Sequence, residues 1–207
     1  MGVFITLEGI DGCGKTTQSR LLAEALERAG HDVVLLREPG GVAISEKIRA
    51  LLLDPGNEEM GGVCELLLYE AARAQLVHQV IAPALASGKV VVCDRFHDST
   101  TAYQSFAGGL DLSAVKRANS LAVDGCLPDL TIVFDLPPAV ACERTAGRGI
   151  DRMEAKGMAF QERVAAGFRA IADDEPDRVR IVDAAPGPDE VFRSVASLVS
   201  SLGLELA

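Results

Sequence analysis

A glycine-rich segment near the start of the chain has the composition of a loop that binds phosphate groups. Residues 9–16 read Gly-Ile-Asp-Gly-Cys-Gly-Lys-Thr and fit the pattern Gly-x-x-x-x-Gly-Lys-Thr at every fixed position. The glycines let backbone N–H groups converge on phosphate oxygens, and a helix that begins here presents its N-terminus to the anion. In such a loop Lys15 reaches the β- and γ-phosphates and Thr16 reaches Mg²⁺. The sequence therefore predicts an ATP site. Its expected residues are Gly9, Ile10, Asp11, Gly12, Cys13, Gly14, Lys15, Thr16 and Thr17.

The flanks of this loop have the pattern that the motif requires. The apolar run at 3–7 predicts a buried strand before the loop, and residues 16–28 predict a helix after it. A glycine-rich turn that matched the motif by chance would not need a strand before it or a helix after it. We therefore interpret residues 9–16 as a phosphate loop.

An acidic and a basic residue follow a second apolar run. Val-Val-Val-Cys at 90–93 predicts another buried strand, and Asp94 and Arg95 come directly after it. Ligands of open α/β sheets bind at the carboxyl ends of the strands, so both side chains are expected in one crevice with the phosphate loop. A carboxylate there suits the Mg²⁺ shell, and we predict a metal site at Thr16 and Asp94. Taken in isolation, an Asp-Arg pair is also typical of a surface ion pair.

A third segment, residues 144–157, combines arginines with glycines as lids over phosphates do. Arg144, Arg148 and Arg152 are spaced by four, which would place them on one face of a helix. Two glycines between them weaken such a helix. An exposed helix with surface ion pairs is the alternative interpretation.

Length and composition limit the class of protein. A chain of 207 residues is long enough for one α/β domain, which we expect to span 1–207. Thirty acidic and twenty basic residues give a net charge of −10, which argues against a nucleic-acid partner or an anionic membrane surface. Without a leader-like start or an apolar run near 20 residues, we expect a cytoplasmic protein. The five cysteines show neither C-x-x-C pairs nor zinc spacing and are expected to be reduced thiols.

Five apolar runs alternate with helical patterns along the chain. They lie at 3–7, 33–36, 90–93, 130–134 and 180–182. Near-continuous apolar strands of this kind indicate an α/β fold with a five-stranded parallel sheet and helices on both faces. A long helix is expected over 64–87, ending at Gly88. Loops are expected at 54–62, 106–111 and 145–157.

Several segments together resemble one family, the thymidylate kinases, which transfer a phosphate from ATP to dTMP. The matching segments are Glu-Gly-Ile-Asp-Gly-Cys-Gly-Lys-Thr-Thr-Gln at 8–18, Arg-Glu-Pro-Gly-Gly at 37–41, Ala-Ala-Arg-Ala-Gln at 71–75, Asp-Arg at 94–95 and Ser-Thr-Thr-Ala-Tyr-Gln at 99–104. They occur in the family's order and span much of the chain. The resemblance implies a P-loop fold like that of the nucleoside monophosphate kinases, dTMP and ATP as substrates, Mg²⁺, and a homodimer in which the helix over 64–87 is a possible interface.

The resemblance also implies roles for individual residues. The expected dTMP-binding residues are Asp11, Arg37, Tyr69, Arg73, Arg95, Ser99, Tyr103 and Gln104. Arg95, helped by Arg37, would hold the dTMP phosphate, a task suited to a forked guanidinium. Arg73 would donate to a thymine carbonyl, and Tyr69 stands where the family usually stacks phenylalanine on the base. Asp11 would lie near the sugar 3′-hydroxyl, Ser99 and Gln104 would contact the base edge, and Tyr103 would crowd the 2′ position.

The glycine at position 12 bears on the source of the catalytic arginine. Some family members carry arginine there, while others have glycine and supply the arginine from the lid. The chain resembles the second kind, and Arg148 is the first candidate, with Arg144 and Arg152 as alternatives. The catalytic residues are therefore expected to be Lys15, Arg95 and Arg148.

Two other functions fit part of the same pattern. A kinase of another monophosphate or of a deoxynucleoside would keep the loop and change the acceptor pocket. A nucleotide-dependent switch would release phosphate to water, although the chain lacks the Asn-Lys-x-Asp run of a guanine-binding GTPase. Arg95 and the arginine-rich lid favour transfer over a switch. The resemblance at Arg73, Ser99, Tyr103 and Gln104 favours dTMP as the acceptor. The phosphate of dTMP, with a second pKa near ~6, needs no general base.

Overall fold

The computed structural model describes residues 2–147 and 152–207. Its five strands are β1 (Val3–Glu8), β2 (Val33–Arg37), β3 (Val90–Asp94), β4 (Leu130–Asp135) and β5 (Val179–Asp183). They form one parallel sheet in the order β2-β3-β1-β4-β5. The predicted α/β architecture is therefore confirmed, and each strand lies within about two residues of its predicted range.

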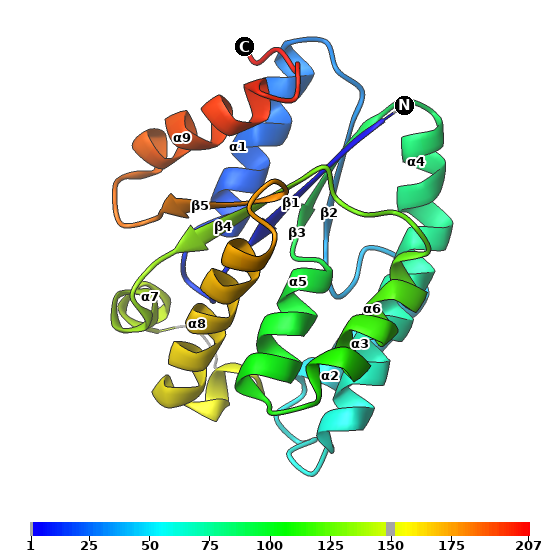
Figure 1. Ribbon diagram of the computed structural model, residues 1–207, viewed down its shortest axis with the longest axis vertical. Coiled ribbons are helices and arrows are strands. Elements are labelled where there is room, and N and C mark those ends of the chain that lie inside the picture. Colours follow the sequence, from blue (N-terminus) through cyan, green and yellow to red (C-terminus); the bar gives the residue numbers. More distant parts are fainter. Residues whose placement is uncertain (1, 148–151) are drawn as a thin grey trace.

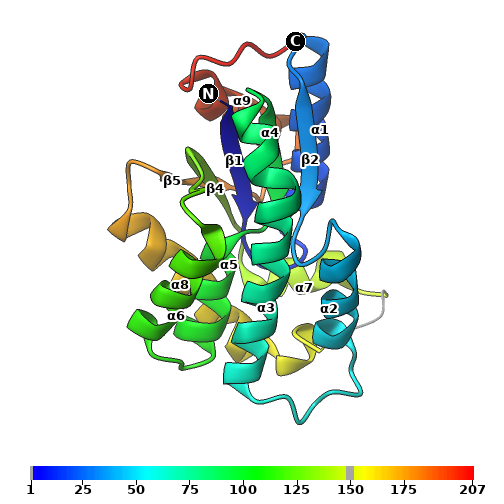
Figure 2. The ribbon, with the colours of Figure 1, turned by 90° about the vertical axis from the view of Figure 1, so that its right-hand side faces the viewer.

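The helices of the described ranges connect these strands. They are α1 (Lys15–Arg28), α2 (Ala43–Leu53), α3 (Gly62–Leu76), the π-helical η1 (Val77–Ile81), α4 (Ala82–Ala86), α5 (His97–Thr100), the π-helical η2 (Thr101–Ala107), α6 (Leu112–Val123), α7 (Pro138–Thr145), the 3₁₀ turn η3 (Glu154–Lys156), α8 (Met158–Asp174) and α9 (Pro188–Ser200). Figure 1 shows α1 and α9 side by side, with α8 along the lower part of the molecule. Figure 2 shows α3 continuing through η1 into α4 as one long rod.

The period-two alternation of the strands sorts side chains between the two faces of the sheet. In β1, Phe4 packs with the α3–α4 rod, whereas Ile5 and Leu7 pack with Leu22 and Leu26 of α1. β3 alternates in the same way, and all five of its residues are buried. Both faces of β1 and β3 are therefore covered, which explains why their sequences are almost continuously apolar.

Three local predictions need refinement. The helix predicted over 64–87 is a helical run from 62 to 86 that contains a π turn, and Gly88 ends it with a φ of 79°. The loop predicted to begin at Phe106 begins two residues later, because η2 extends through Ala107. The lid predicted at 144–157 begins with the end of α7 and contains η3, and residues 148–151 lie outside the described residues.

The topology places the chemistry at one edge. β1 and β3 are neighbours, and their register pairs Leu7 with Asp94. The loop after β1 and the residues after β3 therefore leave the sheet side by side at its carboxyl edge. This is the position at which parallel sheets bind their ligands.

Candidate active site

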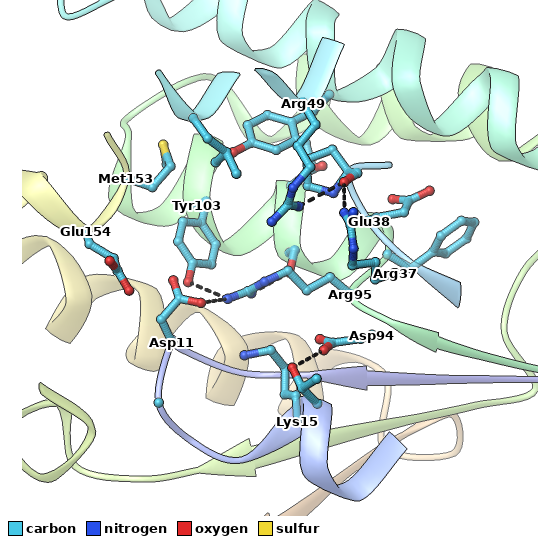
Figure 3. A pocket seen from close by; sticks show the side chains of 18 of the residues that line it. Asp11, Lys15, Arg37, Glu38, Arg49, Asp94, Arg95, Tyr103, Met153 and Glu154 are labelled. Carbon is cyan, nitrogen blue, oxygen red and sulfur yellow. Dashed lines mark hydrogen bonds and ion pairs between the residues drawn. The ribbon is translucent and has the colours of Figure 1, made fainter. Parts of the chain in front are cut away.

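A cavity of about 480 Å³ opens at the carboxyl edge of the sheet. Of the residues expected at the site, those that line it are Asp11, Gly12, Gly14, Lys15, Thr16, Thr17, Arg37, Tyr69, Arg73, Asp94, Arg95, Ser99, Tyr103 and Gln104. Gly9, Ile10 and Cys13 belong to the loop beneath it, and Arg148 lies outside the described residues. Figure 3 shows side chains from the loop after β1, from α1, from the end of β3 and from α2 and η2 converging on one space.

The phosphate loop has the backbone conformation that its glycines predict. Gly9, Gly12 and Gly14 have φ values of 138°, 83° and 99°, a region that L side chains rarely adopt. A Cβ on Gly12 would also lie 2.4 Å from the carbonyl oxygen of Ala141. An arginine at position 12 would be strained in this backbone conformation and would require the loop or Ala141 to shift.

Lys15 is the first residue of α1 and lies inside the curve of the loop. Its Nζ donates to the carbonyl oxygens of Gly9 at 3.0 Å and Ile10 at 2.8 Å. The side chain is 5% exposed and borders the cavity. A buried ammonium at a helix N-terminus combines point charge with free backbone donors, the arrangement that attracts phosphate.

Thr16 and Asp94 meet between the loop and β3. The Thr16 hydroxyl donates to Asp94 Oδ2 over 2.6 Å. Within the described residues, no group of three or more His, Cys, Asp or Glu side chains could enclose a metal. One hydroxyl and one carboxylate at a phosphate loop suit Mg²⁺, which keeps several waters and takes other oxygens from phosphates.

Arg95 occupies the centre of the crevice. Its Nη1 donates to the carbonyl oxygen of Gly9 at 2.9 Å, and its Nη2 donates to Asp11 Oδ1 at 2.7 Å. The guanidinium carbon lies 5.2 Å from the centre of the Tyr103 ring, whose hydroxyl accepts a bond of 3.3 Å from Nη2 (Figure 3). Although burial acts to lower it, the pKa of Arg95 is raised by neighbouring groups, of which Asp11 is foremost. A permanent cation is thus held between the phosphate loop and the opposite wall.

Two more arginines come from the far side of the crevice. Arg37 ends β2, and its Nη2 contacts both carboxylate oxygens of Glu46 at 3.0 and 3.1 Å. Arg49 of α2 donates to the carbonyl oxygen of Pro39 at 2.9 Å and lines the cavity. Figure 3 shows Arg49 reaching toward Arg95. Sequence reasoning missed Arg49, although a basic residue in an otherwise apolar stretch of a helix was an available signal.

Arg73 lies on α3 in a buried network. It is 2% exposed, its Nε and Nη2 contact Glu38 Oε2 at 2.9 and 2.8 Å, and its Nη1 contacts Glu70 Oε1 at 2.6 Å. Nη1 also donates to the Thr100 hydroxyl at 2.9 Å. Burial raises the pKa of Glu38, while the charge of Arg73 acts to lower it. These contacts fix the guanidinium rigidly at the cavity wall, a role for Glu38 that sequence reasoning also missed.

The other acceptor-side residues surround this wall. Tyr69 lines the cavity from α3, and Gln104 Nε2 donates to Glu65 Oε1 at 2.9 Å. Burial raises the pKa of the Tyr103 hydroxyl well above its ordinary value, so it remains neutral near pH 7. The Ser99 hydroxyl accepts a bond from Arg95 and is part of its support.

The described arginines of the lid are held in different ways. Arg144 borders the cavity and donates to the carbonyl oxygens of Ala184 and Ala185 at 3.0 and 3.1 Å. Arg152 is 6% exposed, pairs with Glu65 at 2.6 Å and donates to the carbonyl oxygen of Leu52 at 2.7 Å. It thereby anchors the segment to the end of α2 and to α3, and it does not border the 480 Å³ cavity.

Comparisons with known proteins agree on one family. A family model described as thymidylate kinase matches residues 7–195. A protein of Geobacter sulfurreducens named thymidylate kinase is 50% identical over 206 residues, covering 96% of this chain and 97% of that protein. One of Desulfosudis oleivorans with the same name is 48% identical, covering 95% of this chain and 96% of its own.

A solved structure shows the same likeness in three dimensions. The thymidylate kinase of Ehrlichia chaffeensis superposes with a TM-score of 0.81 at 35% identity. The match covers 96% of this chain and 98% of that one. Among the described residues there is no helix with the length and apolar character needed to cross a membrane.

Proposed function

The chain belongs to the thymidylate kinase family and phosphorylates dTMP to dTDP with ATP, and we propose that the crevice around Arg95 carries out this transfer. The observation that supports the assignment is the position of Arg95. Its guanidinium bonds the phosphate loop at Gly9 and Asp11 and also borders the cavity shared with the acceptor-side residues. One cation can therefore contact groups on both sides of the transfer.

The donor phosphates belong at the loop of residues 9–16. The backbone donors of the loop and Lys15 would hold the β- and γ-phosphates, and Thr17 lies beside them at the start of α1. Thr16 and Asp94 would hold Mg²⁺, which when bound neutralises charge on the donor phosphates. Their hydroxyl–carboxylate bond keeps both oxygens directed at the same space.

The acceptor phosphate belongs between Arg95 and the arginines Arg37 and Arg49. Three cations around a dianion would neutralise the repulsion between donor and acceptor and hold the attacking oxygen in line. The phosphate of dTMP is largely ionised at pH 7, with a second pKa near ~6, so no side chain needs to remove a proton. This fits a crevice in which Tyr103 is neutral and Arg95 is permanently charged.

The base and sugar belong along the wall that Tyr69, Arg73 and Gln104 form. The Tyr69 ring offers a face for stacking. Arg73 is held by Glu38 and Glu70, so its orientation toward a base carbonyl costs little further entropy. Asp11 and the Tyr103 hydroxyl both accept from Nη2 of Arg95, and there they would border the sugar.

The lid would supply the last positive charge. Arg148 remains our first candidate and lies outside the described residues. Arg144 borders the cavity and is the alternative. Arg152 is buried against Glu65 and Leu52, which favours an anchoring role over contact with the transferred phosphoryl group.

A homodimer would cover an apolar face of the molecule. Exposed large apolar side chains lie on three adjacent helices, at Ile44 and Leu51 of α2, Val63 and Leu67 of α3, and Leu121 of α6. Figure 2 shows α2, α3 and α6 facing the same side. Light scattering should give twice the chain mass, and Leu67→Lys should give the monomer mass; a wild-type monomer would contradict the dimer.

We also place the enzyme in the cytoplasm, because it uses ATP and its five cysteines, all within the described ranges, carry free thiols.

Acceptor specificity tests this function directly. ADP release from ATP and Mg²⁺ should be measured with dTMP, dUMP, UMP, CMP, AMP, GMP, thymidine and no acceptor, with products identified. We expect dTDP from dTMP and slower turnover of dUMP, since one methyl group is worth only about 1–3 kcal/mol. Release that is independent of the acceptor would indicate an ATPase and would overturn the proposal.

A further inference from the structure

A buried carboxylate outside the cavity lies directly behind Arg95. Glu8 is the last residue of β1, is 0% exposed and is not part of the cavity wall. Its Oε1 accepts from the backbone N–H groups of Phe96 at 2.7 Å and Ser99 at 3.2 Å. Its Oε2 accepts from the Ser99 hydroxyl at 2.5 Å. All three bonds go to the turn that follows Arg95.

This turn needs such support because of the backbone at Arg95. Arg95 has a φ of 73°, in the left-handed region that residues other than glycine rarely adopt. That conformation is strained and persists only where the surroundings determine it. The Arg95 N–H donates to the carbonyl oxygen of Leu7 at 2.9 Å, and Glu8 binds the next N–H group of the chain. The end of β1 therefore clamps the turn from both sides of its unusual residue.

A second connection runs through side chains. The Ser99 hydroxyl donates to Glu8 Oε2 and accepts from Arg95 Nη1 at 3.1 Å. Because the Ser99 hydroxyl donates its hydrogen to the carboxylate, its lone pairs are left to accept from the guanidinium. Glu8 thus orients Arg95 through the backbone and also through this relay.

We propose that Glu8 is a positioning residue for phosphoryl transfer, which holds Arg95 in the orientation that receives the acceptor phosphate through the 96–99 turn and the Ser99 hydroxyl. This inference rests on the proposed role of Arg95. Glu8 touches neither substrate, and its effect is expected on the dTMP side alone.

The ionisation of Glu8 provides a signature. Burial and, to a smaller extent, the charge of Asp98 raise its pKa to about 7, although the Ser99 hydroxyl, the charge of Arg95 and the Phe96 N–H act to lower it. Around neutral pH the carboxylate therefore passes between an acceptor-only form and a form that carries a proton. In the protonated form, the oxygen that carries the proton becomes a donor and accepts less strongly.

Glu8→Gln tests the proposal with nearly unchanged shape. We expect kcat/KM for dTMP at pH 8 to fall about tenfold or more, as for loss of a charged hydrogen bond, and the KM for ATP to change less than about twofold. Asp129→Asn is the matched control, because the Asp129 carboxylate also accepts from a backbone N–H, that of Phe4, at the opposite end of β1. Asp129→Asn should lower stability, but it should not change the kinetic constants for dTMP more than those for ATP.

The pH profile separates positioning from loss of structure. The ratio of wild-type to Glu8→Gln kcat/KM cancels the titration of dTMP itself, which both enzymes share. We expect this ratio to fall toward one as pH drops from 8 to 5.5, because protonated Glu8 resembles glutamine. A ratio that is constant with pH would overturn the role of the charge.

A double-mutant cycle separates this inference from the proposed function. In an Arg95→Ala background, adding Glu8→Gln should cause no further loss on dTMP, since both act through one guanidinium. If Arg95→Ala impairs dTMP use and Glu8→Gln does not, the inference on Glu8 fails alone. If Arg95→Ala leaves dTMP use intact, the proposed function of Arg95 fails.

Ser99→Ala provides a second test of the proposal if Glu8→Gln does not fold. Ser99→Ala removes the relay and leaves both backbone bonds to Glu8. It should lower kcat/KM for dTMP by a few-fold, about the effect of one hydrogen bond, at an unchanged KM for ATP. Equal losses for dTMP and ATP in this folded variant would overturn the proposal.

Discussion

Arg95 Nη2 and Asp11 Oδ1 lie 2.7 Å apart, and this ion pair joins the residue after β3 to the phosphate loop after β1. Both side chains are largely buried, at 16% and 29% exposed, so solvent screens the pair less than a surface pair. Neighbouring strands deliver the two residues to one edge of the sheet. The cation that we propose for the acceptor phosphate is thus positioned by the loop that we propose for the donor phosphates.

The Thr16–Asp94 bond predicts a specific defect in metal use. Asp94→Asn should raise the Mg²⁺ concentration for half-maximal activity by about tenfold or more, as is typical when a carboxylate that orients a ligand is lost. Activity measured against Mg²⁺ at saturating ATP checks this. Asp135→Asn is the control, because Asp135 also ends a strand, β4, which lies two strands away from β3, and it pairs with Arg169. An equal shift in both variants would argue against the assigned metal site.

The ring and the hydroxyl of Tyr103 should contribute differently to kcat/KM for dTMP. Tyr103→Phe loses one long bond to Arg95 and should lower kcat/KM for dTMP no more than about fivefold. Tyr103→Ala also loses the ring that packs against the guanidinium and should lose more than about tenfold. Steady-state kinetics on dTMP decide the order, and equal losses would remove the role assigned to the ring.

The lid prediction concerns rate more than binding. Arg148→Ala should lower kcat by about 100-fold or more, the order expected of an arginine that stabilises charge in phosphoryl transfer, at an unchanged dTMP affinity. Arg144→Ala is the comparison, because the Arg144 guanidinium is occupied by two carbonyl oxygens. A large kcat loss in Arg144→Ala with none in Arg148→Ala would reverse the assignment.

Glu8 should make stability depend on pH near neutrality. Its folded-state pKa of about 7 lies above the ordinary 4.5, so the folded state holds a proton that the unfolded state releases. The free energy of unfolding should therefore fall as pH rises from 4.5 through 7, by at most about 3 kcal/mol from this group. Asp98 and Glu65, whose pKa values are lowered, lose their contribution only at more acid pH.

Urea denaturation at pH 5 and pH 8 measures this dependence. Glu8→Gln should remain folded at both values and show a smaller difference between them than the wild type. Glu38, whose pKa is also raised, remains in both proteins and cancels in the comparison. An identical difference in the two proteins would show that Glu8 is not protonated in the folded state.

The features of the fold and the site that depend on local sequence pattern could be predicted from the sequence. The phosphate loop, the five apolar strands and the Asp94–Arg95 pair were predicted because hydrophobic runs and glycine positions are encoded within a few residues. Their meeting at one edge followed from the geometry of parallel sheets. The resemblance to the family then supplied the acceptor-side residues that line the cavity.

Other features depend on contacts between distant segments. Glu8 ends an apolar strand, and nothing in its neighbours reveals that it bonds the turn at 96–99. The left-handed backbone of Arg95 and the pairing of Arg73 with Glu38 likewise require tertiary structure. Arg152 shares the spacing of the other lid arginines, yet its burial against Glu65 gives it a different environment.

The most direct test of the account is the effect of Arg95→Ala on the two substrates. We predict that kcat/KM for dTMP falls by at least about 100-fold, because removing a charged partner of the acceptor phosphate costs several kcal/mol, while ATP binding measured by calorimetry changes less than about threefold. Equal losses for dTMP and ATP, or unchanged dTMP kinetics, would contradict the placement of the acceptor phosphate at Arg95.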